Sequence, residues 1–243
     1  MKALIAKARK DYHKSLLENG VLTVDTKGIP SNADSSSKLS IAIARGIANQ
    51  LMAETHDKAV GQTSGAKFEQ LNMQFLMETF PNLQKLRPGK WHIVKLGNRN
   101  AIKTSSFAQY EHLDYLSKLT ESDAKLAASM GNDYMVAPDV VIYRDTVTDE
   151  EINSPQIIVD DTVCKMADIR AQNGGLLPIL HASVSAKWTM RSDRAQNSRT
   201  FALYELIKAV EATGAEDSIE MLNVLIDGKR IKDISDLPLD LAI

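Results

Sequence analysis

The chain has 243 residues, of which 44% are hydrophobic and 25% charged, so it can bury the core of a globular protein. Its formal net charge of −2 excludes a protein that holds nucleic acid by bulk positive charge, so any DNA contact must come from a local basic cluster. The single cysteine excludes an internal disulfide and a zinc site built on cysteine pairs, and no apolar run approaches the ~20 residues of a membrane span. With no signal-peptide pattern at the N-terminus, we expect a cytoplasmic protein with no membrane partner.

The first part of the chain has a helical pattern. Apolar residues at helical spacing predict helices over residues 1–19, 39–58 and 66–80. A turn-rich loop over 20–37 precedes the second helix, which Ser37 or Ser40 is placed to cap. Residues 61–65, with glycine at both ends, are expected to interrupt the helical pattern, and Pro81 to end the third helix.

From residue 91 onward, strand patterns enter. The predicted elements are a short strand over 91–94, a helix over 106–129, and strands over 134–143, 156–159 and 176–185. Pro138 within the second of these strands indicates an edge or a bulge. Beyond residue 200 we expect helices over 201–212 and 215–225, a strand at most over 223–226, a turn over 227–230 and a packed tail over 237–243. Without repeats or a low-complexity linker, a single α/β domain over 1–243 is the simplest account.

Two charged residues lie in or next to predicted strands, where they indicate a catalytic or metal-binding role. Asp139 interrupts an apolar run, and an unpaired buried carboxylate is costly unless it binds a cation. Lys187 follows Ser185 at the end of a later strand, and residues two apart share one strand face. If the two strands pair, Asp139 and Lys187 meet at one metal, as Mg²⁺-dependent phosphodiester cleavage requires. The alternative interpretation is a purely structural Asp–Lys pair between strands.

A cluster of charged residues follows Lys187. Residues 187–199 contain four basic residues and one acidic residue, a local charge of +3. Within it, Arg191 and Arg194 have the donors that read guanine O6 and N7, and Asp193 can accept from cytosine N4. The spacing therefore predicts a reader of adjacent G·C pairs close to the chemistry. The alternative is an ordinary solvated charge run.

The chain resembles the NgoMIV-like type II restriction endonucleases, in the CCGG-reading branch of the PD-(D/E)xK nucleases. The resemblance is carried by residues 138–139, by 181–200 (HASVSAKWTMRSDRAQNSRT) and by 234–241 (ISDLPLDL). It implies a restriction-endonuclease-like α/β core, with a central mixed sheet flanked by helices. It also implies two Mg²⁺ ions per active site, a homotetramer arranged as a dimer of dimers, and cleavage of double-stranded DNA at a CCGG-core palindrome, GCCGGC.

The resemblance implies roles for single residues as well. Asp139 corresponds to a metal ligand, Lys187 to the catalytic lysine, and Ser185 replaces the usual acidic residue of the triplet. Glu69 corresponds to an acidic residue that supports the metal site; without the resemblance it is an exposed helix glutamate. The implied DNA contacts are Arg191, Asp193 and Arg194 at the inner C·G pairs, Gln62 in the minor groove, and Asp34, Ser35 or Ser36 at the outer pair. Without the resemblance these last four belong to ordinary polar loops.

One departure from the family pattern concerns the junction at 200/201. Because serine stands at 185, the family supplies another carboxylate fourteen residues past the lysine, where this chain has Phe201. The sequence after Thr200 looks like a segment from nearer the family's C-terminus, so a block of about one helix and one or more strands is expected to be missing. Glu205 can substitute only partly. Two further functions stay open: a protein that binds GC-rich DNA but cuts poorly, and a structural or interaction protein in which Asp139 and Lys187 merely pair.

Overall fold

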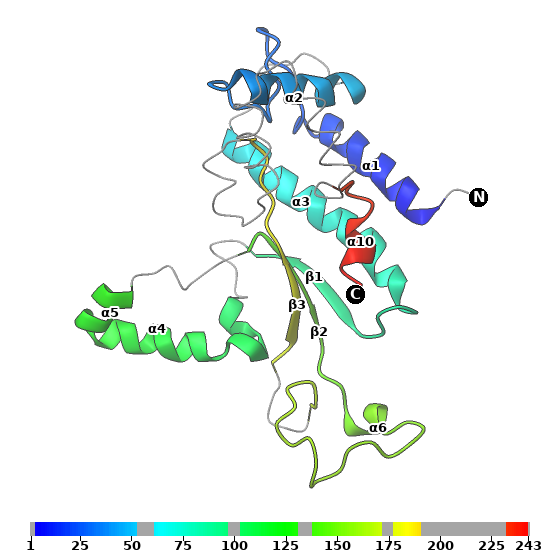
Figure 1. The fold of residues 1–243 in the computed structure, drawn as a ribbon, viewed down its shortest axis with the longest axis vertical. Helices are drawn as coiled ribbons and strands as arrows, with labels where there is room; N and C mark the ends of the chain where they lie inside the picture. Colours follow the sequence, from blue (N-terminus) through cyan, green and yellow to red (C-terminus); the bar gives the residue numbers. More distant parts are fainter. Residues whose placement is uncertain are drawn as a thin grey trace. The chain divides into compact units, whose positions relative to one another are not determined.

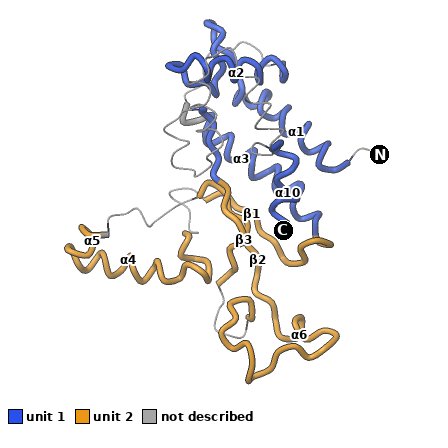
Figure 2. The backbone as a smooth tube through the Cα atoms, in the orientation of Figure 1, with its two compact units in different colours: residues 1–83, 185–243 blue, residues 84–184 orange. Residues whose placement is uncertain are grey.

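A computed structural model describes residues 3–52, 61–96, 103–130, 138–171, 177–190 and 232–242 (Figure 1). The chain divides into two compact units: unit 1 comprises residues 1–83 and 185–243, and unit 2 comprises residues 84–184 (Figure 2). Among the described helices, none has the length and apolar character needed to cross a membrane.

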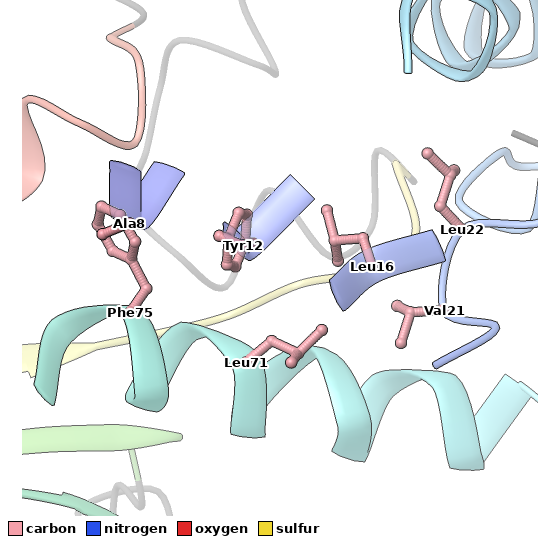
Figure 3. Close-up of a cluster of buried hydrophobic side chains, with 7 residues drawn as sticks. All are labelled: Ala8, Tyr12, Leu16, Val21, Leu22, Leu71 and Phe75. Atoms are coloured by element: carbon pink, nitrogen blue, oxygen red, sulfur yellow. The ribbon is translucent and has the colours of Figure 1, made fainter. Parts of the chain in front are cut away.

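Unit 1 is built on helices. They are α1 (Leu4–Glu18), α2 (Lys38–Gln50), α3 (Gly61–Thr79), the 3-10 turn η1 (Phe80–Leu83) and the short α10 (Leu237–Asp240). One face of α1 carries Ala8, Tyr12 and Leu16 at four-residue spacing, and this face packs on Leu71 and Phe75 of α3 (Figure 3). The burial of these apolar side chains stabilises the packing of α1 on α3.

Two contacts of Tyr12 fix how α1 meets α3. The Tyr12 ring lies edge-on to Phe75, with centroids 5.6 Å apart, and its hydroxyl donates to Asn72 Oδ1 at 3.2 Å. Burial raises the pKa of the Tyr12 phenol well above its usual value, so the hydroxyl stays protonated and remains a donor.

Most helix predictions for unit 1 are confirmed. Ser37 caps α2, because its Oγ accepts from the Ser40 backbone N–H at 3.2 Å. The expected interruption over 61–65 is wrong: α3 already begins at Gly61. Glycine costs about 1 kcal/mol in a helix interior, which the packing of the following apolar face outweighs. The second predicted helix ends earlier than expected, because α2 stops at Gln50 and Met52 has a left-handed backbone with φ 55°; residues 53–58 of that prediction lie outside the described residues.

Unit 2 contains a three-stranded antiparallel sheet in the order β1-β2-β3. The strands are β1 (Trp91–Lys95), β2 (Val140–Arg144) and β3 (Ile179–Val184). The central strand β2 begins with three residues that have no exposed surface, because it is covered along both edges and packed by Phe107 and Leu96. These strands confirm three of the predicted ones. The parallel pairing of a mixed sheet does not occur among the described strands of this sheet.

The helical part of unit 2 is more broken than the pattern predicts. It consists of η2 (Thr104–Ser106), η3 (Ala108–Tyr110), α4 (His112–Ser122), α5 (Ala124–Met130) and α6 (Asp149–Ile152). The predicted helix over 106–129 is interrupted at Asp123, whose backbone is extended. Its Oδ1 accepts from the N–H groups of Lys125 and Leu126 at 2.9 and 3.1 Å, so this residue starts a new helix instead of continuing the old one.

Two strand predictions are corrected. Residues 156–159 form no strand: Ile157 and Ile158 are 79% and 63% exposed. The Asn153 side chain replaces a strand neighbour, accepting from Ile158 and Val159 N–H at 2.8 and 2.9 Å. Asp139 was expected in mid-strand, yet β2 begins one residue later. The predicted elements between 201 and 230 lie outside the described residues, whereas the tail does pack, with Pro238 and Ala242 buried.

Candidate functional site

Asp139 lies at the end of the β2 ladder in unit 2. Its carbonyl accepts from Leu96 N–H at 2.9 Å, which extends the β1–β2 pairing by one residue. The next residue, Val140, pairs with Val184, the last residue of β3, so the predicted pairing of these two strands is confirmed. The Asp139 side chain is half-buried, not fully buried as its sequence context suggested. Its position at the ladder end is therefore a better argument for function than the cost of burial.

Ser185 and Lys187 follow β3 directly, in unit 1. Both are exposed, whereas the intervening Ala186 and the following Trp188 are half-buried. This alternation has the period of an extended chain and agrees with the prediction that Ser185 and Lys187 share one face. The exposed face thus carries a hydroxyl and an ammonium group, both of which can donate to a phosphate.

The segment that carries Lys187 is anchored by an aromatic contact. Trp188 packs against Phe68 of α3, with ring centroids 4.9 Å apart, on the edge of the α1–α3 core. Each of these rings is the sequence neighbour of a predicted site residue, because Lys187 precedes Trp188 and Glu69 follows Phe68. Glu69 is half-buried, so it is not the fully exposed glutamate of the alternative interpretation. Sequence reasoning missed this pair, although an aromatic residue beside Lys187 was the available signal.

Asp34, Ser35 and Ser36 form a tight polar loop before α2. Asp34 is half-buried, and its Oδ1 accepts from the N–H and the hydroxyl of Ser36 at 3.0 and 2.7 Å. Ser35 and Ser36 are exposed. These local bonds hold the Asp34 carboxylate in one orientation. A carboxylate that accepts from one defined donor needs such a fixed orientation.

This loop is joined to the end of the 185–190 segment. Met190 N–H donates to the Asn32 carbonyl at 2.9 Å. The Ser40 hydroxyl donates to the Met190 carbonyl at 2.9 Å and accepts from Asp34 N–H at 2.8 Å. Unit 1 therefore brings the predicted outer-pair loop against Met190, the residue that precedes Arg191.

Several predicted residues cannot be placed. Arg191, Asp193 and Arg194 lie outside the described residues, as do Phe201 and Glu205, and the side chain of Gln62 in the first turn of α3 is not described. Within the described ranges, no three His, Cys, Asp or Glu residues are gathered closely enough to hold a metal ion. Asp139 is thus the described carboxylate on which a metal proposal rests.

Comparison with known proteins gives two findings. A model of the NgoMIV restriction enzyme family matches residues 12–200 and 200–243. The type II restriction enzyme NgoMIV of Neisseria gonorrhoeae is 37% identical over 287 residues, covering 100% of both chains. The chain therefore belongs to the NgoMIV restriction enzyme family of type II site-specific deoxyribonucleases.

Proposed function

We propose that this chain cleaves double-stranded DNA at a palindrome with a CCGG core, GCCGGC, in a Mg²⁺-dependent reaction. The observation that carries the proposal is the anchoring of residues 185–190. Trp188 packs against the edge of the α1–α3 core of unit 1, and Met190 is hydrogen-bonded beside the 34–36 loop. One anchored segment thus leads from the proposed catalytic Lys187 toward the proposed reader at 191–194. DNA cleavage and sequence recognition would therefore depend on the same supporting segment.

Asp139 and Lys187 are proposed to serve one active site. Chain connectivity supports this, because Asp139 directly precedes Val140 and Lys187 is three residues past Val184, the pairing partner of Val140. Three trans peptide links span at most about 11 Å. Both residues are therefore tied by short backbone segments to the same end of one β ladder.

The residues have distinct proposed roles in hydrolysis. The Asp139 carboxylate would hold Mg²⁺, since this ion prefers hard oxygen ligands. Magnesium, when bound, stabilises negative charge that develops on the scissile phosphate; the family resemblance suggests two ions per site. The Lys187 ammonium would neutralise the same phosphate and orient the attacking water. Ser185 can donate a hydrogen bond but carries no charge, so Glu69 is proposed to add negative charge in support of the metal site.

Recognition is proposed to divide between two segments. Arg191 and Arg194 would donate to guanine at the inner pairs while Asp193 accepts from cytosine. Asp34 would accept from the cytosine of the outer pair, with Ser35 or Ser36 beside it. Because Ser36 donates two hydrogen bonds to Asp34 Oδ1, we propose that it orients the Asp34 carboxylate and does not itself contact a base. Gln62 is proposed to approach the minor groove.

The junction at Thr200-Phe201 bears on how well this chain cuts. The alignment with the Neisseria enzyme runs over 287 positions, 44 more than the 243 residues of this chain, and the family match changes segment at residue 200. Both observations support the proposal that a family segment is missing there, and with it a carboxylate of the metal site. Because the family match covers both sides of the junction, we retain cleavage as the function. A DNA-binding protein with impaired cleavage is the second candidate.

Assembly into a homotetramer, a dimer of dimers, is part of the proposal. A palindromic site suits a two-fold symmetric dimer. The supporting observation for a further interface is a group of exposed apolar side chains on residues 145–171 of unit 2: Ile157, Ile158, Val163 and Met166. Exposed apolar groups of this kind favour contact with another protein surface, for which we propose a second copy of this chain. A DNA substrate and the lone Cys164 support a cytoplasmic location.

The test is cleavage of plasmid DNA that carries one or two GCCGGC sites. With Mg²⁺ we expect cuts at these sites, none in EDTA, and none for Asp139→Ala, which should still shift a GCCGGC duplex in Ca²⁺. Asp11→Ala, which removes an exposed carboxylate of α1, serves as the control and should cut normally. Binding without cutting by the unmodified chain would favour the second candidate. Neither binding nor cutting would overturn the proposal.

A further inference from the structure

The hydroxyl of Ser40 joins two segments that are far apart in the sequence. Ser40 is 5% exposed and lies in the first turn of α2. It donates to the Met190 carbonyl, 150 residues away, at 2.9 Å, and accepts from Asp34 N–H at 2.8 Å. A single buried atom therefore fixes the distance between the backbone at 34 and the backbone at 190.

This role differs from the usual one of a serine at a helix start. The cap of α2 is supplied by Ser37, whose Oγ accepts from the Ser40 N–H. At the third helical position a side chain commonly completes a capping box by bonding back to the cap residue. The Ser40 hydroxyl instead forms the two bonds described above, so its contribution is to connect segments rather than to start the helix.

We propose that Ser40 is a positioning residue for sequence discrimination, an inference that rests on the proposed function. Asp34 serves the outer base pair in that proposal, and Arg191 follows directly on Met190 toward the inner pairs. Base-reading groups discriminate only when each donor and acceptor meets its base edge in register. By tying Asp34 to Met190, Ser40 fixes the backbone of the outer-pair loop relative to the residue that directly precedes Arg191. Contacts to phosphate carry no sequence information and do not depend on this spacing.

The experiment compares Ser40→Ala with Ser37→Ala in the full chain. Ser37→Ala removes a hydroxyl from the same helix start but leaves both bonds of Ser40 in place. Dissociation constants are measured in Ca²⁺ for a GCCGGC duplex, an ACCGGT duplex with the outer pair changed, and an unrelated duplex. Measuring binding keeps the test independent of whether the metal site supports turnover.

For Ser40→Ala, which loses both bonds of the hydroxyl, we expect weaker binding of GCCGGC by about tenfold, which is about 1.4 kcal/mol and lies within the range for a buried hydrogen bond. Binding of the unrelated duplex should be unchanged. The preference for GCCGGC over ACCGGT should fall by a similar factor, whereas Ser37→Ala should keep both ratios within about twofold. Ser40→Cys conserves the side-chain volume and weakens the same bonds, so it should shift the ratios in the same direction if the alanine variant folds poorly.

The outcomes separate this inference from the function on which it rests. Unchanged ratios in Ser40→Ala and Ser40→Cys, or an equal loss in Ser37→Ala, would overturn the positioning role while leaving the proposed specificity intact. If the unmodified chain binds all three duplexes equally, the proposed specificity fails, and the inference fails with it.

Discussion

Residues 185–190 of unit 1 and residues 145–171 of unit 2 both contain little regular structure, yet different forces hold them. Trp188 ties the first segment to an apolar core, and backbone bonds of Met190 fix its end. In the second segment, Arg170 is 3% exposed. Its guanidinium group donates hydrogen bonds from Nε, Nη1 and Nη2. It pairs with Asp149 and donates to the carbonyls of residues 160, 163 and 164 at 3.3, 2.8 and 3.3 Å.

The two segments should respond differently to substitution. Apolar packing is spread over many contacts, so the 185–190 segment should lose order only together with the core of unit 1. In the 145–171 segment many bonds converge on one cation, Arg170, and its removal takes a donor from the Asp149 carboxylate and from the carbonyls of residues 160 and 163. We therefore expect single substitutions to separate chemistry, which we assign to the first segment, from assembly, which we assign to the second.

The largest effect is expected for Lys187→Ala. Lys187 is exposed, so its loss should leave the core and the 145–171 segment unchanged while removing positive charge from the scissile phosphate. We expect single-turnover cleavage to slow by roughly 10²–10³-fold, the size found when one transition-state donor is removed, with little change in DNA affinity. Lys10→Ala, an exposed lysine of α1, is the control. An equal loss in both variants would show that Lys187 acts only through bulk charge.

Trp188→Ala tests the packing of the 185–190 segment. The substitution removes the ring that contacts Phe68, and large aromatic-to-alanine changes cost about 3–5 kcal/mol when buried. Because Trp188 is half-buried, we expect a loss near the lower end of that range, measured by urea unfolding. Cleavage should fall as well, since Lys187 loses its anchor. A normal rate at full stability would contradict the anchoring role.

Arg170→Ala should loosen residues 145–171 and leave the 185–190 segment unchanged. We expect residues 145–171 to become sensitive to proteinase K and the proposed tetramer to dissociate into dimers, as measured by light scattering. Binding of a GCCGGC duplex should persist. Arg170→Lys keeps the charge but cannot reach Asp149 and three carbonyls at once, so it should behave like the alanine variant. A stable tetramer in both variants would remove the 145–171 segment from the proposed interface.

The stability of residues 145–171 at low pH should depend on the ionisation of Asp149. The hydrogen bond from Arg170 holds the pKa of the Asp149 carboxyl below its usual range. Since folding lowers this pKa, the stabilisation is fully present above the ordinary value of about 4 and is lost as the pH falls through the folded value. A dye on Cys164, which is exposed and the single cysteine, should gain mobility only below about pH 4, and Asp149→Asn should abolish that step. A transition at neutral pH would contradict the assignment.

The sequence predicted the parts of the fold that rest on local periodicity. Apolar residues stand at four-residue spacing along α1, and burial follows that spacing (Figure 3). The strands β1 and β3 were predicted from short apolar runs instead. The failures occurred where a polar side chain replaced a regular neighbour. Asn153 satisfies the backbone of residues 158–159, and Asp123 starts a helix inside a continuous apolar stripe. Periodicity contains no information on such side-chain bonds.

The sequence pointed to candidate site residues by their chemical type, but not to the contacts that hold their segments in place. Asp139 was singled out as a carboxylate in an apolar run and Lys187 as an ammonium group after a later strand, while the role of Ser185 came from the family resemblance. The pairing of the two strands is confirmed, and the roles of these residues stay predictions. The link from Ser40 to Met190 spans 150 residues, and no short pattern encodes such a separation. The same holds for the contact between Phe68 and Trp188.

The smallest effects are expected from two helix caps, one in each unit. Ser37 Oγ accepts from Ser40 N–H at 3.2 Å in α2, and Thr148 Oγ1 accepts from Glu151 N–H at 3.3 Å in α6. Removing a cap hydroxyl costs about 1 kcal/mol when the helix belongs to the cooperative core. Ser37→Ala should therefore lower the free energy of global unfolding by about that amount, since α2 carries buried Leu39 and Ala44.

Thr148→Ala should leave global unfolding almost unchanged, because α6 has four residues and none of them is buried. Its effect should appear as faster amide hydrogen exchange confined to residues 145–171, as expected for a segment that opens independently of the core. Equal losses in global stability from both caps would mean that the 145–171 segment unfolds together with the rest of the chain. In that case Arg170 would be one contributor to a common core, and the contrast between a packed and a polar segment would not hold.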